Sequence, residues 1–475
     1  MDEFFAKDPI GSFIQNQFVE KKGQKAVSLV SSVNQDKWKK VHLVTEKQID
    51  QAIQSAYLSF LSFRQTTAYE RAEILKKVAS LLRCYKDKVA RIITTEMGKT
   101  LRESYAEIEY SAGYFEWFAE EAKRVYGYSI PSHAPEKELN VHHEPVGVVG
   151  VITPWNFPVA MAARKVAPAI AAGCTAIVKP SPETPYSLLT VAAMFFEAGL
   201  QKGALSVLIG DEKKIGKKLL ESPRVRKITF TGSTAVGKYL YRESAETLKK
   251  LTLELGGHAP VLVFDDADLD SAVEETVRAK FRNNGETCAA ANRIFLQKGI
   301  EKEFISKLVK RVKKLKVRNP FLEEADLSTI LHPLSLGRIP KHIKDAKEKG
   351  AKVVLQGQTP AHPTILTGCT SEMKIFQEET FGPTMALSTF KEDQEGVALA
   401  NDTPYGLAAY VMTRCMEWAR LCRKNLRFGF IGINDGIPSA PHVPFGGIKY
   451  SGFGREGGPS GIYEYLVEKF ISQKF

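Results

Sequence analysis

The chain is 475 residues long, 44% hydrophobic and 25% charged, with a formal net charge of +12. This composition is ordinary for a globular protein and excludes a disordered chain, and the length suggests about three domains. No apolar run reaches the ~18 residues of a transmembrane helix. The acidic start Met1–Phe5 lacks the apolar stretch of a signal peptide. We therefore expect a cytoplasmic protein without a membrane segment.

The positive charge alone does not indicate nucleic-acid binding, because the basic residues are spread along the chain. Their densest run, from Lys307 to Arg318, alternates with leucine and valine, which is typical of the wet side of an amphipathic helix. The six cysteines form no CxxC pair, which suits a reducing compartment and excludes a disulfide scaffold or zinc ribbon. We expect no metal site and no nucleic-acid partner.

The first 145 residues divide by pattern into three parts. Residues 1–45 contain short alternating stretches that predict edge strands. Residues 46–122 repeat apolar side chains at helical spacing, and Gly98 is expected to end one of these helices. Residues 123–145 hold two strand-like runs around a polar tip. They predict a protruding hairpin for subunit contact or, alternatively, a surface loop.

From residue 146 onward, continuous apolar strands alternate with helices. The expected strands are 146–152, 175–178, 206–209 and 227–230, and the expected helices are 159–172, 185–198 and 212–221. This rhythm predicts an α/β fold with a parallel sheet covered on both faces. Such sheets bind ligands at the carboxyl ends of their strands, so the residues at those ends are the candidates for a functional site.

The first strand ends in Thr153-Pro154-Trp155-Asn156-Phe157-Pro158. Pro158 fits the first turn of the next helix, so Asn156 lies near a helix N-terminus. There its amide either caps the helix or donates to an oxyanion. The helix that follows is apolar except for Arg164 and Lys165. Such charges need partners, either structural ion pairs or a bound anion.

Two later strand ends suit a nucleotide. Lys179 follows the second strand and could bond a ribose or a phosphate. Residues 232–238 fit the P-loop pattern GxxxxGK, but position 239 is Tyr where Ser or Thr would hold magnesium. The weaker prediction is that the turn at Gly232 and Ser233 leads into a helix N-terminus and binds a diphosphate. The chain has no GxGxxG fingerprint.

A carboxylate and a cysteine complete the candidate chemistry. Glu254 stands between leucines, where burial would raise its pKa and suit it as a base; the alternative is an outward-facing strand residue. Cys288 follows a predicted helix that opens at Ser271 with a capping box to Glu274 and stops at Asn284-Gly285. The turn would let the thiol reach a cleft, whereas the alternative is a small core cysteine.

These motifs occur in one order along the chain, together with three more near its end. The motifs are Thr-Pro-Trp-Asn-Phe-Pro at 153–158, Lys-Pro at 179–180, Phe-Thr-Gly-Ser at 230–233, Leu-Glu-Leu-Gly-Gly at 253–257, Gly-Glu-Thr-Cys at 285–288, Glu-Thr-Phe-Gly-Pro at 379–383, Pro-Phe-Gly-Gly at 444–447 and Ser-Gly-Phe-Gly-Arg-Glu at 451–456. In this order they resemble the aldehyde dehydrogenase superfamily over essentially the whole chain.

The resemblance implies a role for each matching residue. Cys288 would be the nucleophile that attacks an aldehyde, and Asn156 with the Cys288 backbone N–H would hold the oxyanion. Glu254 would be the base that activates the hydrolytic water, and Lys165 and Glu456 would relay its proton. The implied cofactor contacts are Thr153, Trp155, Lys179, Ser181, Pro182, Gly232, Ser233, Glu379 and Phe381.

Finer matches at 454–458 and 461–466 resemble the succinate-semialdehyde dehydrogenase branch. They imply that Arg164, Arg282 and Ser439 hold the distal carboxylate of the substrate. Two guanidiniums suit a short carboxylate, because arginine forms bidentate pairs with it. Succinate semialdehyde is the implied substrate. Glutarate semialdehyde is the alternative, because one methylene changes binding by only ~1–3 kcal/mol.

Two departures from this branch carry predictions. Ala290 stands where many members have a second cysteine, so we predict no local disulfide switch. Pro182 stands where NAD-preferring members often have Glu. Without that acid nothing at position 182 repels a 2′-phosphate, so NADP is favoured and NAD is the alternative.

The resemblance also implies an organisation into domains. We expect a Rossmann-type cofactor domain at 1–122 with 146–256 and an α/β catalytic domain at 257–445. Residues 123–145 with 459–475 would form a small β oligomerisation element of a homodimer or homotetramer. Two other classes of protein remain as alternatives. A P-loop phosphotransferase would need a hydroxyl at position 239. A catalytically silent scaffold is disfavoured because Cys288, Glu254 and Asn156 are all intact.

Overall fold

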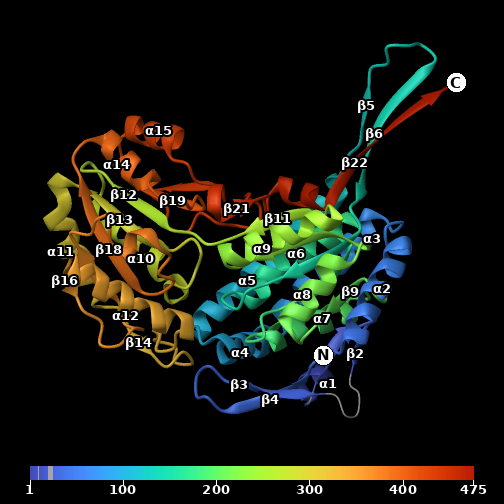
Figure 1. Cartoon of the computed structure of the whole chain (residues 1–475), viewed down its shortest axis with the longest axis horizontal. Coiled ribbons are helices and arrows are strands. Elements are labelled where there is room, and N and C mark those ends of the chain that lie inside the picture. The colour runs from blue at the N-terminus through green and yellow to red at the C-terminus, as the bar shows by residue number, and fades with distance from the viewer. Residues whose placement is uncertain (9, 20–24) are drawn as a thin grey trace.

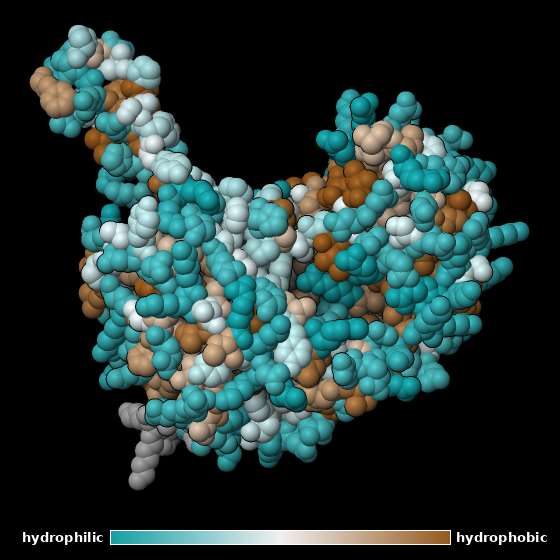
Figure 2. Space-filling model, turned by 180° about the vertical axis from the view of Figure 1, so that it is seen from behind, coloured by the Kyte–Doolittle hydropathy of each residue, from teal (hydrophilic) through white to brown (hydrophobic). Residues whose placement is uncertain are grey.

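The computed structural model describes residues 1–8, 10–19 and 25–475. Two lobes are each built around a large sheet, and a smaller sheet projects away from them (Figure 1). Seen from behind, the two lobes flank a hollow (Figure 2). The sheets have eight, seven and three strands, with two further two-stranded ribbons.

The eight-stranded sheet has the order β2-β1-β9-β8-β7-β10-β11-β21, and its central strands β9, β8, β7, β10 and β11 are parallel. The strands are β1 Ser12–Ile14, β2 Gln17–Val19, β7 Val148–Ile152, β8 Thr175–Lys179, β9 Leu205–Val207, β10 Val225–Thr231, β11 Lys250–Glu254 and β21 Gly452–Phe453. The predicted parallel strands are confirmed, with ends displaced by at most two residues, because their apolar runs are buried on both faces.

Helices cover both faces of this sheet. They are α1 Asp2–Ala6, α2 Glu46–Phe63, α3 Ala68–Cys84, α4 Lys86–Met97, α5 Leu101–Glu121, α6 Pro158–Ala172, α7 Pro185–Glu197, α8 Glu212–Glu221 and α9 Thr234–Ser244. Helices α3 to α7 share one core, and α2, α8 and α9 share the other. Gly98 adopts a left-handed φ of 89° and ends α4, as predicted.

The second lobe holds the seven-stranded sheet β16-β17-β18-β13-β12-β19-β20, in which only β16 is antiparallel to its neighbour. Its strands are β12 Ala259–Val263, β13 Ala291–Gln297, β16 Lys352–Leu355, β17 Thr364–Thr367, β18 Thr384–Phe390, β19 Ala408–Met412 and β20 Phe430–Ile433. Its helices are α10 Leu269–Phe281, α11 Glu301–Val312, α12 Pro333–Glu348, α13 Lys374–Gln377, α14 Asp393–Asn401 and α15 Met416–Asn425. The basic run from Lys307 to Arg318 was predicted as the exposed face of a helix, but only its part up to Val312 lies on α11, and its last two residues form β14, Val317–Arg318.

The helix before Cys288 begins earlier than predicted. The N-cap of α10 is Asp268, whose carboxylate accepts a hydrogen bond from the Ser271 N–H at 2.9 Å, so the predicted capping box at Ser271 is wrong. Aspartate and serine are comparably good caps, and local pattern did not discriminate between them. The helix ends at Phe281, and Asn283, Asn284 and Gly285 then all have left-handed φ values of 54°, 55° and 74°. The helix therefore ends three residues before the stop predicted at Asn284-Gly285, although both of those residues have the left-handed conformation that was expected.

The projecting sheet has the order β22-β6-β5, formed by β5 Tyr128–Ile130, β6 Lys137–Pro145 and β22 Leu466–Lys474. The predicted hairpin and C-terminal strand are both confirmed. Apolar side chains on it are exposed, including Tyr128, Phe470 and Ile471 (Figure 2). The ribbons are β3 Ala26–Val30 with β4 Lys37–His42, and β14 Val317–Arg318 with β15 Leu327–Ser328. The 3₁₀ turns are η1 Ala122–Arg124, η2 Ala245–Thr247, η3 Arg282–Gly285, η4 Lys298–Ile300, η5 Lys449–Ser451 and η6 Pro459–Tyr465.

The described ranges contain neither a membrane-spanning helix nor a metal cluster. None of the helices there is both long and apolar enough to cross a bilayer. Across residues 1–8, 10–19 and 25–475, no group of three or more His, Cys, Asp or Glu side chains is arranged to hold a metal ion.

Candidate active site

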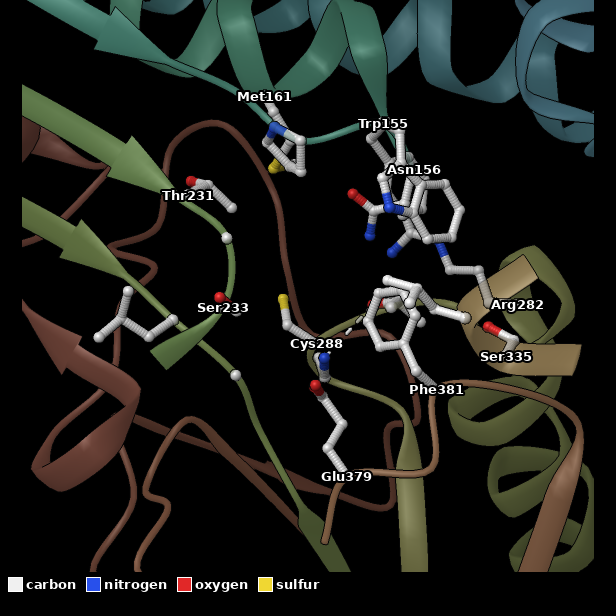
Figure 3. Close-up of a pocket in the computed structure, with 18 of the residues that line it drawn as sticks. Trp155, Asn156, Met161, Thr231, Ser233, Arg282, Cys288, Ser335, Glu379 and Phe381 are labelled. Atoms are coloured by element: carbon white, nitrogen blue, oxygen red, sulfur yellow. Dashed lines mark hydrogen bonds between the residues drawn. The ribbon is translucent and has the colours of Figure 1, made fainter. Parts of the chain in front are cut away.

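A cleft of about 180 Å³ lies between the two lobes, where the carboxyl ends of β7, β10 and β11 face the loops that lead into β13 and β18. It brings together many of the predicted site residues, with Cys288 among them near the centre of Figure 3. Those that line it are Trp155, Asn156, Arg164, Gly232, Ser233, Arg282, Cys288, Glu379, Phe381 and Ser439. For the eight-stranded sheet the position fits the general rule that parallel sheets bind ligands at the carboxyl ends of their strands.

Cys288 lies in the loop between α10 and β13, as a free thiol that is half-buried. Burial raises the pKa of this thiol to about 12, and the nearby Arg164 charge acts against that rise. Gly257 packs on this loop so closely that a Cβ there would lie 2.0 Å from the Cys288 carbonyl oxygen. The second glycine of the Leu-Glu-Leu-Gly-Gly motif is therefore needed for close approach of two backbones.

Asn156 faces the cleft and does not cap α6. The N-cap of that helix is Phe157, which offers no side-chain acceptor. The Asn156 Nδ2 donates to the Glu286 carbonyl at 3.0 Å, which ties it to the loop that carries Cys288. The alternative that Asn156 caps the helix is therefore wrong, because its amide is turned toward the nucleophile loop.

Glu254 ends β11 and is only 2% exposed, so the alternative of an outward-facing residue is wrong. Neither carboxylate oxygen has a hydrogen-bond partner among the described residues. Burial raises its pKa well above the usual range, and the nearby charge of Glu456 acts in the same direction. Glu254 lies beside the cleft without lining it. A carboxylate with a raised pKa and unpaired oxygens can accept a proton near neutral pH.

Arg164 and Lys165 share one buried carboxylate. Glu456 places its oxygens 2.7 Å from Arg164 Nε and 2.5 Å from Lys165 Nζ, and Lys165 also contacts the Thr231 hydroxyl at 2.5 Å. Burial acts to raise the pKa of Glu456, but the charges of Lys165 and Arg164 outweigh it and hold that pKa below its ordinary value. The predicted structural ion pair is therefore present. Arg164 can in addition bind an anion, because it lines the cleft and its buried Nη2 has no hydrogen-bond partner in the described ranges.

Arg282 also points a free guanidinium at the cleft (Figure 3). No hydrogen bond or ion pair to it is found within the described parts of the chain. Its guanidinium carbon lies 5.3 Å from the Phe157 ring centre and 5.7 Å from that of Tyr110, so the cation rests against aromatic faces. The Ser439 side chain completes this end of the cleft.

The opposite end of the cleft has the features of a dinucleotide site. Ser233 caps α9 by accepting from the Val236 N–H, so the Gly232 turn leads into a helix N-terminus. Glu379 accepts from the Gly257 N–H at 3.0 Å, and burial raises its pKa to about 7. A Cβ on Gly256 would lie 3.4 Å from the Glu379 carboxylate, so a side chain there would narrow this end of the cleft.

Aromatic rings close this end of the cleft. Phe381 has a left-handed φ of 55° and meets the Trp155 ring edge-to-face at 5.7 Å between ring centres. These residues fit a nicotinamide dinucleotide. A P-loop would need the Lys238 ammonium to point at the bound phosphates. Instead Lys238 Nζ lies 3.9 Å from the centre of the Tyr450 ring, and Lys238 does not line the cleft.

Four predicted cofactor residues lie near that end without lining the cleft: Thr153, Lys179, Ser181 and Pro182. The Thr153 N–H donates to the Lys179 carbonyl at 3.2 Å, which holds the two strand ends together. The Lys179 ammonium is paired with the carboxylate of Glu212, at the start of α8. Glu212 was not singled out from the sequence, because only strand order brings it beside Lys179.

Comparison with known proteins agrees with this geometry. Residues 18–471 match the family model described as "Aldehyde dehydrogenase family". The chain is 41% identical to succinate-semialdehyde dehydrogenase [NADP(+)] GabD of Escherichia coli over 97% of either chain. It is 45% identical to a glutarate-semialdehyde dehydrogenase of Pseudomonas putida over 88% of either chain.

A solved structure of succinate-semialdehyde dehydrogenase from Burkholderia pseudomallei superposes with a TM-score of 0.96 at 42% identity. The match covers 99% of this chain and 98% of that one. The family model matches nearly all of the chain, and the relatives named above are 41–45% identical to it. The chain belongs to the aldehyde dehydrogenase family.

Proposed function

We propose that this enzyme oxidises a short aldehyde with a distal carboxylate, namely succinate semialdehyde, to the corresponding acid with NADP or NAD. The observation that carries the proposal is that two guanidinium groups, those of Arg164 and Arg282, line the cleft that holds Cys288 and have N–H groups without a partner in the described ranges. Arg164 is buried, and its Nη2 has no hydrogen-bond partner within the described parts of the chain, although buried charged groups normally have one. Arg282 is half-buried and has no hydrogen bond or ion pair there. A carboxylate bound between them would satisfy both.

Cys288 acts as the nucleophile. Its sulfur, once deprotonated, bonds to the aldehyde carbon, and the carbonyl oxygen becomes an oxyanion held by Asn156 Nδ2 and the Cys288 N–H. When bound, the nicotinamide cofactor supplies the acceptor for the hydride that leaves this carbon. The product of that oxidation on the enzyme is a thioester of Cys288. Because burial raises the pKa of the Cys288 thiol, its proton has to pass to solvent water before the sulfur attacks.

Glu254 acts as the general base for hydrolysis of the thioester. Its free carboxylate oxygens accept a proton from water, the water oxygen bonds to the acyl carbon, and the carbon–sulfur bond breaks to release the acid. Lys165 and Glu456 are assigned the removal of that proton. Their support is the 2.5 Å contact between them and their electrostatic coupling to Glu254.

The cofactor end is assigned to Trp155, Gly232, Ser233, Glu379 and Phe381, with Lys179 and its neighbours at the adenosine ribose. NADP is favoured because position 182 is Pro, and the E. coli relative is named for NADP(+). Glutarate semialdehyde remains the second substrate candidate, supported by the name of the P. putida relative. We assign residues 1–122 with 146–256 to the cofactor-binding domain and residues 257–445 to the catalytic domain. Residues 123–145 with 459–475 are assigned to the oligomerisation element.

A homodimer or homotetramer is part of the same proposal, supported by the exposed apolar side chains on the projecting sheet. Exposed apolar surface of this kind marks association sites.

The decisive experiment measures NAD(P)H formation with succinate semialdehyde, glutarate semialdehyde and unsubstituted aldehydes, each with both cofactors. We expect the succinate semialdehyde reaction to have the highest kcat/KM, and Cys288→Ala to abolish it. Cys415→Ala is the matched control, because Cys415 is also a half-buried free thiol but lies outside the cleft. Retained NAD(P)H production in Cys288→Ala would refute the mechanism.

A further inference from the structure

One face of helix α5 contacts both loops of the candidate active site. Glu103, Glu107, Tyr110 and Tyr114 recur at intervals of four, three and four residues, so they share one side of the helix. Tyr110 lines the cleft beside Arg282, and the Tyr114 ring centre is 5.8 Å from the Arg164 guanidinium. The two glutamates of this stripe have no role in the chemistry described above.

Glu107 supplies the cap that α6 lacks. Its Oε1 accepts hydrogen bonds from the Val159 and Ala160 N–H groups at 2.8 and 3.1 Å. The helix has no side-chain cap of its own, and Pro158 has no N–H. A carboxylate at a helix N-terminus satisfies free N–H groups and the helix dipole together. The cap therefore comes from a residue about fifty positions away and fixes α6 to α5.

Lys99 holds this carboxylate in place. Its ammonium lies 2.7 Å from Glu107 Oε2 and 3.8 Å from the centre of the Phe157 ring. Both side chains of the pair are at most 1% exposed. Phe157 directly follows Asn156 in the loop that carries the proposed oxyanion donor. The ion pair therefore contacts this loop through Lys99 and the helix that follows it through Glu107. A buried pair of this kind is costly to desolvate, and hydrophobic packing would hold the helices together without it.

Glu103 makes the matching contact to the nucleophile loop. Its Oε1 accepts from the Asn283 N–H at 2.7 Å, where Asn283 has a left-handed φ of 54°. The Asn283 amide then donates to the carbonyls of Asn156 at 3.3 Å and Glu286 at 3.1 Å. The two loops are thus bonded to each other, and each is bonded to α5.

We propose that Lys99 and Glu107 are positioning residues that set the Asn156 amide against the oxygen formed during attack by Cys288. The inference rests on the proposed function, because it concerns the same oxyanion. A pair that only stabilised the fold would affect every reaction of Cys288 alike. A pair that aims Asn156 affects only reactions in which an oxyanion forms. Removal of an oxyanion donor lowers kcat by about 10²–10³-fold in other enzymes.

The test compares two reactions of the same thiol in Glu107→Gln. Iodoacetamide alkylates Cys288 by direct displacement, in which the sulfur–carbon bond forms as iodide leaves and no oxyanion appears. The pre-steady-state formation of NADPH from succinate semialdehyde requires the oxyanion. We expect the second rate to fall about 10–100-fold, as misplacement of a catalytic group by ~1 Å can do. Alkylation should stay within about twofold and KM should change little.

Glu109→Gln is the matched control, because Glu109 lies on the same helix, is exposed and pairs with Arg83 and Lys86. It should leave both rates unchanged. Glu107→Gln leaves Lys99 buried without its counter-charge, which threatens folding. The double variant Lys99→Met/Glu107→Gln removes both charges, so it should fold and still show the selective loss of NADPH formation.

Three results would overturn the inference. Equal loss of alkylation and NADPH formation in the folded double variant would assign the pair a structural role only. Unchanged NADPH formation in that variant would show that the pair does not aim Asn156. A wild-type enzyme that forms no NADPH with any aldehyde would refute the proposed function itself, and this inference with it.

Discussion

Arg282 is the residue whose replacement tests substrate recognition most directly. Its guanidinium faces the cleft with no ion pair among the described residues, so Arg282→Met breaks no internal salt bridge. Each charge-assisted hydrogen bond to a substrate carboxylate contributes about 1.5–3 kcal/mol. With Arg164 still present, we expect a loss of about 3 kcal/mol in transition-state binding. That is about a 100-fold fall in kcat/KM for succinate semialdehyde.

The assay compares succinate semialdehyde with butanal, which has the same chain length but no carboxylate. The kcat/KM for butanal should change by less than about threefold in Arg282→Met, since no group on butanal meets the guanidinium. Arg278→Met is the control, because Arg278 lies one turn earlier on α10, is exposed and pairs with Glu275. Equal losses for both aldehydes, or no loss for either, would refute the assignment of Arg282 to the carboxylate.

Four further predictions concern the base, the cofactor and redox control. The raised pKa keeps the Glu254 carboxyl protonated above its ordinary range, so thioester hydrolysis should speed up as pH rises through that pKa, and Glu254→Gln should abolish this limb of the pH–rate profile. Because folded Glu254 keeps a proton that the unfolded chain loses, it lowers stability as pH rises, and Glu254→Gln should raise Tm at pH 8. Glu212→Gln should raise the NADP-to-NAD ratio of kcat/KM about tenfold, because a carboxylate beside Lys179 repels a 2′-phosphate; an unchanged ratio would place the ribose elsewhere. Diamide should cause no dithiothreitol-reversible disulfide within the Cys288 peptide of the wild type, whereas Ala290→Cys should acquire one, as peptide masses would reveal.

Local pattern was sufficient for the first sheet and for the order of the motifs. The strands that end at Ile152, Lys179 and Thr231 are apolar runs bounded by turn residues, and such runs are recognisable wherever they occur. Gly98 was predicted to end a helix, and does so, because left-handed φ is a property of one residue. Gly285 also has a left-handed φ, but α10 already ends at Phe281. The start of α10 was misplaced because Asp268 and Ser271 are both competent caps.

The partners of the buried charged residues could not be predicted from local sequence patterns. Glu456 is shared by Arg164 and Lys165 from about 290 positions away, Glu107 caps a helix about fifty positions later, and Glu212 reaches Lys179 from a neighbouring strand's loop. The sequence alone determined that such charges need partners, because desolvation is costly wherever a charge is buried. Only the tertiary structure decided which groups met, because elements far apart in the sequence pack side by side. Within the described residues it leaves Arg164 Nη2 and the Arg282 guanidinium at the cleft without a partner.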